Sequence, residues 1–142
     1  MTGTIFERLK SEGIQTIYEM IESEFQETLT LDFKANLTHP ADPIFANDGK
    51  KLTKSGRKVI AKAASAFANS MGGVLILGVD CRSVEGIDCA QSITLITSLD
   101  KALSTINNEL HSITVPSISG IEAISLAADD GNSGLIAVSV PR

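Results

Sequence analysis

The sequence predicts a single α/β domain, of the α+β kind, in which helices pack on a mixed β-sheet. Its 142 residues suit one domain with one core. Between residues 29 and 79, a strand-like, a helix-like and a second strand-like segment follow one another, which is the order of a βαβ unit. A second helix-like segment follows. Two further strand-like segments, joined by a turn, end the chain as a β-hairpin would.

The N-terminal third contains a helix, a strand and a long loop in this prediction. Residues 1–13 are interpreted as an N-terminal extension. Apolar residues then recur at helical spacing after Gly13, which predicts a helix over residues 14–24. Apolar and polar residues alternate over Leu29–Lys34, the pattern of a half-buried strand. Residues 36–52 are rich in Pro, Asn, Asp and Gly, so they are predicted to form a loop.

A helix is predicted from Thr53, a suitable N-cap, to about Met71, and Gly72 is suited to end it. Val74–Val79 is a short apolar run after a glycine pair, typical of a strand buried on both faces. Joined through the helix, the two strands are predicted to be parallel. The inner stripe of the helix is expected to contain Val59, Ile60, Ala63, Ala64 and Phe67.

The C-terminal half begins with a predicted turn region over residues 81–91. Leucine and isoleucine at spacings of three and four then predict a helix over Ser92–Leu110, with Leu95 on its inner stripe. Ile121–Ala127 and Leu135–Val140 are predicted strands. The turn-forming residues between them predict the hairpin.

The charge of the chain is unevenly distributed. The net charge of −5 argues against a protein that coats polyanions by charge alone. Residues 1–71 are neutral, with nine basic and nine acidic residues, whereas residues 72–142 have three basic and eight acidic ones. One segment has only positive charges, and it is either a phosphate-contacting surface or a solvated helix face. Its basic residues are Lys50, Lys51, Lys54, Arg57, Lys58 and Lys62.

Several function classes have no support in the sequence. There is no apolar stretch of 18 residues, and Met1–Lys10 has no signal-peptide pattern, so we expect no membrane association and a cytoplasmic location. The Gly72-Gly73 pair leads into a strand, whereas a phosphate-binding loop leads into a helix. No aromatic residues are interleaved with the basic ones, so strong base readout is not expected.

Two motifs resemble those of the Schlafen/AlbA-like domain family. The first is the stretch Ser65–Asp80, with Ala-Phe-Ala-Asn, then Gly-Gly, then an apolar strand that ends in Gly-Val-Asp. The second is Glu27–Lys34, in which an acidic residue is followed five positions later by Asp-Phe-Lys. Here Asp32 stands where the family more often has Glu. The ending Val140-Pro141 is also similar, so the resemblance covers residues 14–142.

The resemblance implies a nucleic-acid-binding domain and, as in some Schlafen proteins, a metal-dependent ribonuclease site with three acidic residues. The matching positions are Glu27, Asp32 and Asp80, with Mg²⁺ or Mn²⁺ as the suitable cation and Lys34 as a partner for phosphate charge. Parallel strands would place Asp32 and Asp80 at one edge of the sheet. Glu27 joins them only if the chain bends before Thr28. On spacing alone, solvated strand-end carboxylates are the favoured alternative.

Three functions therefore remain as hypotheses. The first is a nucleic-acid-binding module that contacts the phosphate backbone through Lys34 and the basic residues of Lys50–Lys62. The second is an Mg²⁺- or Mn²⁺-dependent endoribonuclease. The third is a regulatory or assembly module of a longer protein. The sequence leaves open whether DNA or RNA is bound, whether the chain forms a homo-oligomer, and whether a further domain follows residue 142.

Overall fold

A four-stranded mixed sheet lies at the centre of the computed structural model, with the strand order β1-β6-β10-β9. Its strands are β1 (Leu31–Lys34), β6 (Gly73–Leu77), β10 (Gly134–Val140) and β9 (Glu122–Ala127). β1 and β6 are parallel and the other pairs are antiparallel, so the predicted α+β fold is confirmed. The structure describes residues 2–23, 25, 28, 30–35, 37–39, 42–46, 49–84, 87–114 and 117–142, and at 2–4, 37–39, 42–43, 81–84 and 87–91 it describes the backbone only.

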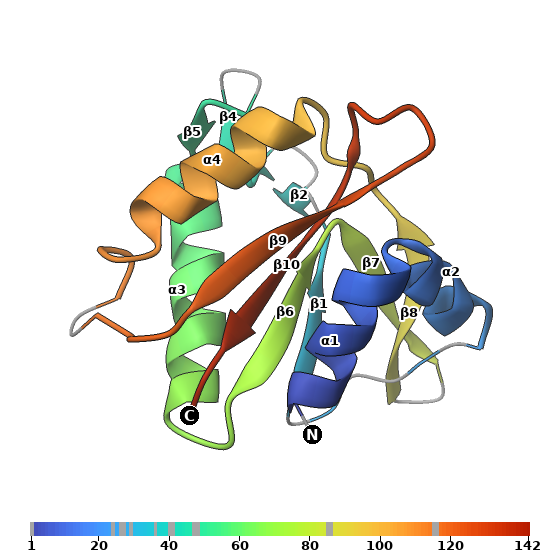
Figure 1. Cartoon of the computed structure of the whole chain (residues 1–142), viewed down its shortest axis with the longest axis horizontal. Helices are drawn as coiled ribbons and strands as arrows, with labels where there is room; N and C mark the ends of the chain where they lie inside the picture. Colours follow the sequence, from blue (N-terminus) through green and yellow to red (C-terminus); the bar gives the residue numbers. More distant parts are fainter. Residues whose placement is uncertain are drawn as a thin grey trace.

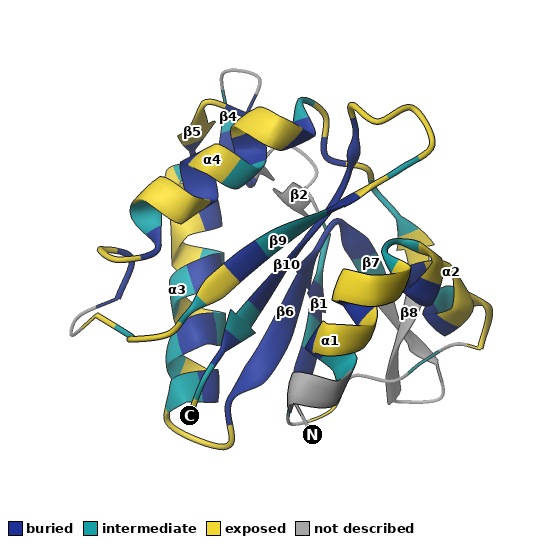
Figure 2. Ribbon diagram, in the orientation of Figure 1, coloured by how far each residue is buried: buried dark blue, intermediate teal, exposed yellow. Residues whose placement is uncertain are grey.

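Helices cover both faces of this sheet (Figure 1). One face packs against α1 (Thr2–Glu12) and α2 (Gln15–Glu22), and the other against α3 (Lys54–Ala68) and α4 (Leu99–Glu109). Successive residues of a strand point to opposite faces, so each strand supplies both layers. The sheet is accordingly buried along most of β6 and β10 (Figure 2).

The predicted βαβ unit consists of β1, α3 and β6. Gly56 N–H donates to the Thr53 hydroxyl at 2.9 Å, as expected of an N-cap. The two glycines after the helix have different roles. Gly72 has a φ of +78°, which the turn requires. A Cβ at Gly73 would lie 2.3 Å from the ring of Phe67. The buried ring therefore fits only because residue 73 has no side chain.

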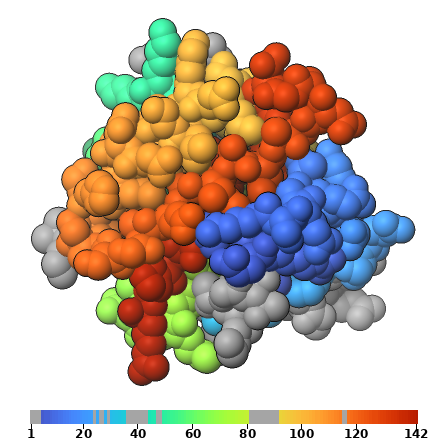
Figure 3. Space-filling view, in the orientation of Figure 1, coloured from blue at the N-terminus to red at the C-terminus, as the bar shows by residue number. Residues whose placement is uncertain are grey.

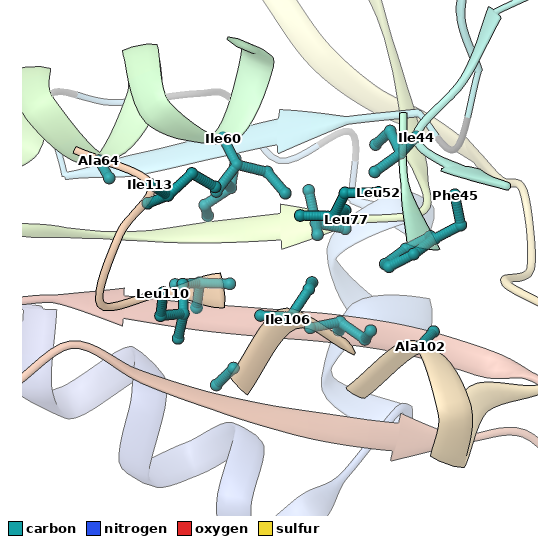
Figure 4. Packing of buried hydrophobic residues seen from close by; sticks show 14 of the residues in the cluster. Ile44, Phe45, Leu52, Ile60, Ala64, Leu77, Ala102, Ile106, Leu110 and Ile113 are labelled. Atoms are coloured by element: carbon teal, nitrogen blue, oxygen red, sulfur yellow. The ribbon is translucent and has the colours of Figure 1, made fainter. Parts of the chain in front are cut away.

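The larger apolar cluster lies between the sheet and the pair α3 and α4. Ile60 of α3, Leu77 of β6 and Ile106 of α4 point into the same interior (Figure 4). All three are at most 1% exposed. Phe67, predicted for the inner stripe of α3, is 6% exposed, which confirms its burial.

Within residues 1–13, expected as an extension, Thr2–Glu12 form the packed helix α1. Phe6 and Leu9 are buried and join Ile17 and Met20 of α2 over the second face of the sheet. Gly13 ends α1 with a φ of +66°, so the glycine separates two helices of one layer. The segment is thus part of the core, because its apolar residues at helical spacing must be covered.

The predicted loop over residues 36–52 contains two short strand pairs, so that prediction was wrong in detail. β2 (Leu37–His39) pairs with β3 (Asp42–Pro43), and β4 (Phe45–Ala46) pairs with β5 (Lys51–Leu52). Ile44, Phe45 and Leu52 are buried in the larger cluster. These apolar anchors among turn-forming residues hold the segment against α3 and α4.

The predictions for residues 81–98 were also wrong. A hairpin of β7 (Val79–Val84) and β8 (Ile87–Ile93) replaces the turn region, and α4 begins only at Leu99. Ser92 pairs with Asp80 in the hairpin ladder, and Leu95 is 41% exposed. Cross-strand pairing has therefore overridden a helical spacing that was locally consistent.

Candidate nucleic-acid interface

The positively charged segment carries its basic side chains on the surface of the molecule. It runs through the turn before β5, along β5 and into α3. Every one of its basic side chains is exposed. We call this set the basic surface, and its members are Lys50, Lys51, Lys54, Arg57, Lys58 and Lys62.

The helix α3 presents its lysines away from the core. Its buried residues, among them Ile60, Ala64 and Phe67, share one side. Lys54, Lys58 and Lys62 recur every four residues, so they form a row on the opposite side. Four residues of helix rise about 6 Å, so the row spaces its ammonium groups along the helix axis.

Packing holds the start of the basic surface in place. The hydroxyl of Thr105 in α4 donates to the Gly49 carbonyl at 2.6 Å, in a buried position. Gly49 has a φ of +87°, and a Cβ there would lie 3.2 Å from the Ala102 nitrogen. This close approach fixes the turn from which Lys50 and Lys51 project. The backbone at the start of the basic surface is therefore held against α4.

Arg57 differs from the lysines around it. Its guanidinium donates to Glu109 at the end of α4, and the two side chains are 46% and 20% exposed. This ion pair links α3 to α4 and compensates part of the Arg57 charge. Within the described residues, no carboxylate lies within 4.0 Å of any lysine of the basic surface.

The end of α3 adds to the positive potential. The exposed backbone amides at a helix N-terminus carry partial positive charge, which favours acidic side chains there. The first turn of α3 contains no acidic residue and has Lys54 instead. This arrangement is unfavourable for helix stability by about 0.3–1 kcal/mol. The first turn of α3 thus adds its partial positive charge to that of Lys54.

Two residues of the predicted acidic site lie together on β1. Asp32 and Lys34 are two positions apart, so their side chains share one face of the strand. Asp32 Oδ2 is 3.4 Å from Lys34 Nζ, and Asp32 is 21% exposed. Asp32 also lines a hollow of about 270 Å³ between β1 and α3. The other residues of the hollow are Thr28, Leu31, Ala63, Ala66, Phe67 and Ser70.

Asp80, the other predicted carboxylate that the structure describes, does not end the strand β6 as predicted. β6 ends at Leu77, Gly78 turns the chain with a φ of +108°, and Asp80 lies in β7. In the parallel register Lys34 is opposite Leu77, whereas Asp32 is opposite Leu75. Lys34 thus lies at the end of β1 nearer to the continuation toward Asp80.

The described residues contain no cluster of side chains that could form a metal centre. Glu27 lies outside the described residues. No group of three or more His, Cys, Asp or Glu side chains that could hold a metal ion occurs among the others. The three-carboxylate site stays a prediction, and we derive no chemical step through a cation.

A comparison with known protein families assigns this chain to one of them. The profile of the Schlafen, AlbA_2 family matches residues 27–142. The chain belongs to the Schlafen, AlbA_2 family. This membership is consistent with a nucleic-acid-related domain. Neither the curated proteins nor the solved structures contain a significant match.

In this Schlafen, AlbA_2 domain, the two contacts that shape the basic surface were missed by the sequence reasoning. They are made by Thr105 and Glu109, which lie 56 and 52 residues from their partners. No local pattern indicates such pairs. The helices of the described residues also lack the length and apolar character that crossing a bilayer requires.

Proposed function

We propose that this chain binds nucleic acid through phosphate contacts made by the basic surface. The observation that carries the proposal is the concentration of exposed lysines from Lys50 to Lys62, on a backbone that packing holds against α4 at Gly49. Lys–phosphate contacts release counterions and need no particular base sequence. The contacts position the polyanion without reading it.

Strong base readout is not part of this proposal. Aromatic side chains that stack on bases need an exposed ring. Phe45 and Phe67 are the aromatic residues closest in sequence to the basic surface, and both are buried in the core. Binding is therefore expected to differ little between sequences of the same length and strandedness.

Because the net charge of the chain is −5, a polyanion is attracted only where positive charge is concentrated, as on the basic surface. The acidic C-terminal half repels a polyanion, so approach is productive only from the side of α3. We expect affinity to fall steeply as the salt concentration rises. Lys34, which contacts Asp32, is expected to contribute less than the lysines of α3.

A fluorescence-anisotropy titration with single-stranded RNA and DNA, repeated over a range of salt concentrations, tests the proposal. Replacing Lys54, Lys58 and Lys62 with Ala should weaken binding to all sequences alike. If all three contact phosphates, the slope of log K against log salt should flatten by about 2 to 3. The substitutions are exposed, so the thermal midpoint should change little.

A charge-matched pair of variants separates local contact from net charge. Lys58→Ala/Lys62→Ala should weaken binding, whereas Lys10→Ala/Lys101→Ala, with the same loss of charge elsewhere, should not. Equal effects of the two pairs would contradict a defined interface. Parent protein that binds neither polymer at low salt would favour the regulatory or assembly module instead.

An Mg²⁺- or Mn²⁺-dependent endoribonuclease is the second candidate. It is favoured by the position of Asp32, half-buried beside Lys34 and next to a hollow bordered by hydroxyl groups. Incubation of structured and single-stranded RNA with Mn²⁺ or with a chelator tests it. Cleavage that requires the metal and is lost in both Asp32→Asn and Asp80→Asn would support this candidate. Cleavage that persists equally in the chelator and in either variant would overturn it.

A further inference from the structure

The strand β9 forms one edge of the central sheet. It is hydrogen-bonded to β10 on one side, and no strand pairs with its other side among the described residues. It is six residues long, and its register with β10 has no irregularity. Native edge strands are usually protected by charge, proline, a bulge or shortness.

Proline, a bulge and shortness are absent along β9, and α1 and α4 flank its edge without forming a ladder with it. Its sequence from Ala123 to Ala127 contains neither proline nor a charged residue. Glu122 is its single charge, and Lys10 of α1 lies 3.3 Å from the Glu122 carboxylate and compensates it. The opposite edge of the sheet differs, because β1 has only four residues, two of them the charged Asp32 and Lys34.

The register shows which backbone groups of β9 are directed outward. Gly134 exchanges both of its backbone hydrogen bonds with Ile96, away from β9, so it bonds no backbone group of Ala127, opposite it. In an antiparallel ladder, bonded and non-bonded pairs alternate. The N–H and C=O groups of Ala123, Ser125 and Ala127 are therefore directed toward the unpaired edge.

The edge lies in a groove between two helices. β9 runs between α4 and α1 (Figure 1), and both helices border it on the surface in Figure 3. The groove has a volume of about 400 Å³. Its walls beside the strand come from Leu9 and Lys10 of α1, from Gly13 directly after α1, and from Leu103 of α4. Apolar walls beside unpaired backbone groups suit another β-strand.

We propose that two copies of this chain pair through β9. The strands would run antiparallel, with the two-fold axis at Ser125. Ser125 then exchanges two hydrogen bonds with the second Ser125, and Ala123 does so with Ala127 of the other copy. Every outward amide and carbonyl of β9 finds a partner, and the two sheets become one.

The side chains of β9 fit this self-pairing. Ala123, Ser125 and Ala127 share the face toward α4, where small residues would meet small residues. Ile124 and Leu126 share the face toward α1, where Ile124 would lie opposite Leu126 of the other copy as an apolar cross-strand pair. Glu122 would lie opposite Ala128 of the other copy, so no carboxylate is directly opposite it. A second copy is therefore complementary to the edge in its backbone hydrogen bonding and in the side chains that would lie directly opposite each other.

This pairing leaves the basic surface accessible. α3 packs against β6 and β10, whereas α4 packs against β9. The lysine row of α3 is thus not part of the proposed interface, and the dimer would carry two copies of it. The inference does not depend on the proposed nucleic-acid binding.

Sedimentation velocity over a series of protein concentrations tests the proposal. The variants place a positive or a negative charge at Ser125, on the two-fold axis. The parent should form a dimer. Ser125→Lys and Ser125→Glu should each be monomeric, because like charges would face each other across the axis. An equimolar mixture of the two variants should recover a heterodimer. Circular dichroism and thermal midpoints check that each variant is folded.

A second variant keeps the test independent of added charge. Ser125→Pro removes an outward N–H and no ladder bond to β10, so it should abolish the dimer while the fold is retained. Ser125→Ala should dimerise as the parent does. A parent that is monomeric at the highest soluble concentration overturns the proposal, whether or not the edge accepts a strand from another protein. Variants that all remain dimeric also overturn it, because the interface would then lie elsewhere.

Discussion

Phe67 and Gly73 show at the residue scale why the glycine pair follows α3. The ring of Phe67 occupies the space in which a Gly73 side chain would lie. Gly73 has no positive φ, unlike Gly72, so its role is steric. The same two glycines thus serve a turn and a packing contact.

Gly73→Ala is expected to destabilise the fold by about 1–3 kcal/mol, because the added methyl group displaces a buried ring. Urea unfolding followed by circular dichroism measures this loss. Phe67→Ala alone should cost about 3–5 kcal/mol. The two costs should not add in the double variant, because Phe67→Ala removes the ring that the new methyl group meets. Strict additivity would show that the two positions do not share the space.

Asp130 stabilises the turn between β9 and β10. Its carboxylate accepts from Ser133 N–H and Asn132 N–H, both at 3.0 Å, and from the Ser133 hydroxyl. These bonds, with that from Ser133 N–H foremost, hold the pKa of Asp130 below its usual value. A lowered folded-state pKa means that the carboxylate stabilises the fold above the unfolded pKa, about 3.9. That contribution is lost as the pH falls through the folded value.

Asp130→Asn should therefore lower the thermal midpoint at neutral pH. The difference from the parent should shrink as the pH is lowered below about 4, where the parent carboxylate also becomes protonated. Thermal unfolding over a pH series measures this. Asp129→Asn removes the same charge from the neighbouring residue of the turn and should change the midpoint much less. If the difference in thermal midpoint between Asp130→Asn and the parent is independent of pH, the ionised carboxylate is not what stabilises the turn.

At the scale of elements, the ion pair of Arg57 and Glu109 couples α3 to α4 and lowers the charge that Arg57 can offer to phosphate. Glu109→Gln removes the acceptor charge beside the basic surface. We expect nucleic acid to bind more tightly, with a salt slope steeper by about 0.7–0.9 if Arg57 gains one phosphate contact. Anisotropy titrations at several salt concentrations measure both quantities.

The control for this prediction is Asp100→Asn, which makes the same change of net charge in the first turn of the same helix. It should change affinity much less, since Asp100 has no ion pair with the basic surface among the described residues. Equal gains in both variants would mean that net charge alone governs binding.

At the scale of the whole molecule, the N-terminal helices complete a core that the family match does not include. The match begins at residue 27, whereas α1 and α2 end at Glu12 and Glu22. They cover the sheet face formed by Leu31, Phe33, Val74, Ile76, Leu135 and Ala137. Without them this face would be exposed to water.

A fragment of residues 27–142 is therefore expected to lose cooperative thermal unfolding and to bind a hydrophobic dye. In the full chain, Phe6→Ala/Leu9→Ala should destabilise the fold by several kcal/mol, because both side chains are buried. The exposed pair Glu7→Ala/Ser11→Ala should have little effect. A fragment that unfolds as cooperatively as the full chain would show that the two helices are dispensable.

The sequence by itself determined the elements that depend on local pattern. The alternation before Lys34, the N-cap at Thr53, the glycine turn at Gly72 and the hairpin around Asp130 are all present in the structure, although α3 ends at Ala68 and not near Met71. Each rests on neighbours within a few residues, where spacing and backbone preference are sufficient. The lysines of the basic surface were equally predictable, because charges four residues apart on a helix share one side.

Only the tertiary structure decided what depends on distant partners. Residues 92–98 have a helical spacing, yet Ser92 lies in a strand ladder and Leu95 is exposed. Arg57 and Glu109 lie 52 residues apart, and their ion pair exists only because α3 and α4 pack side by side. The unpaired edge of β9 likewise follows from the order of the strands, which no local spacing encodes. Cross-strand bonds and helix packing join residues that are far apart in the chain, so they appear only when the whole core has formed.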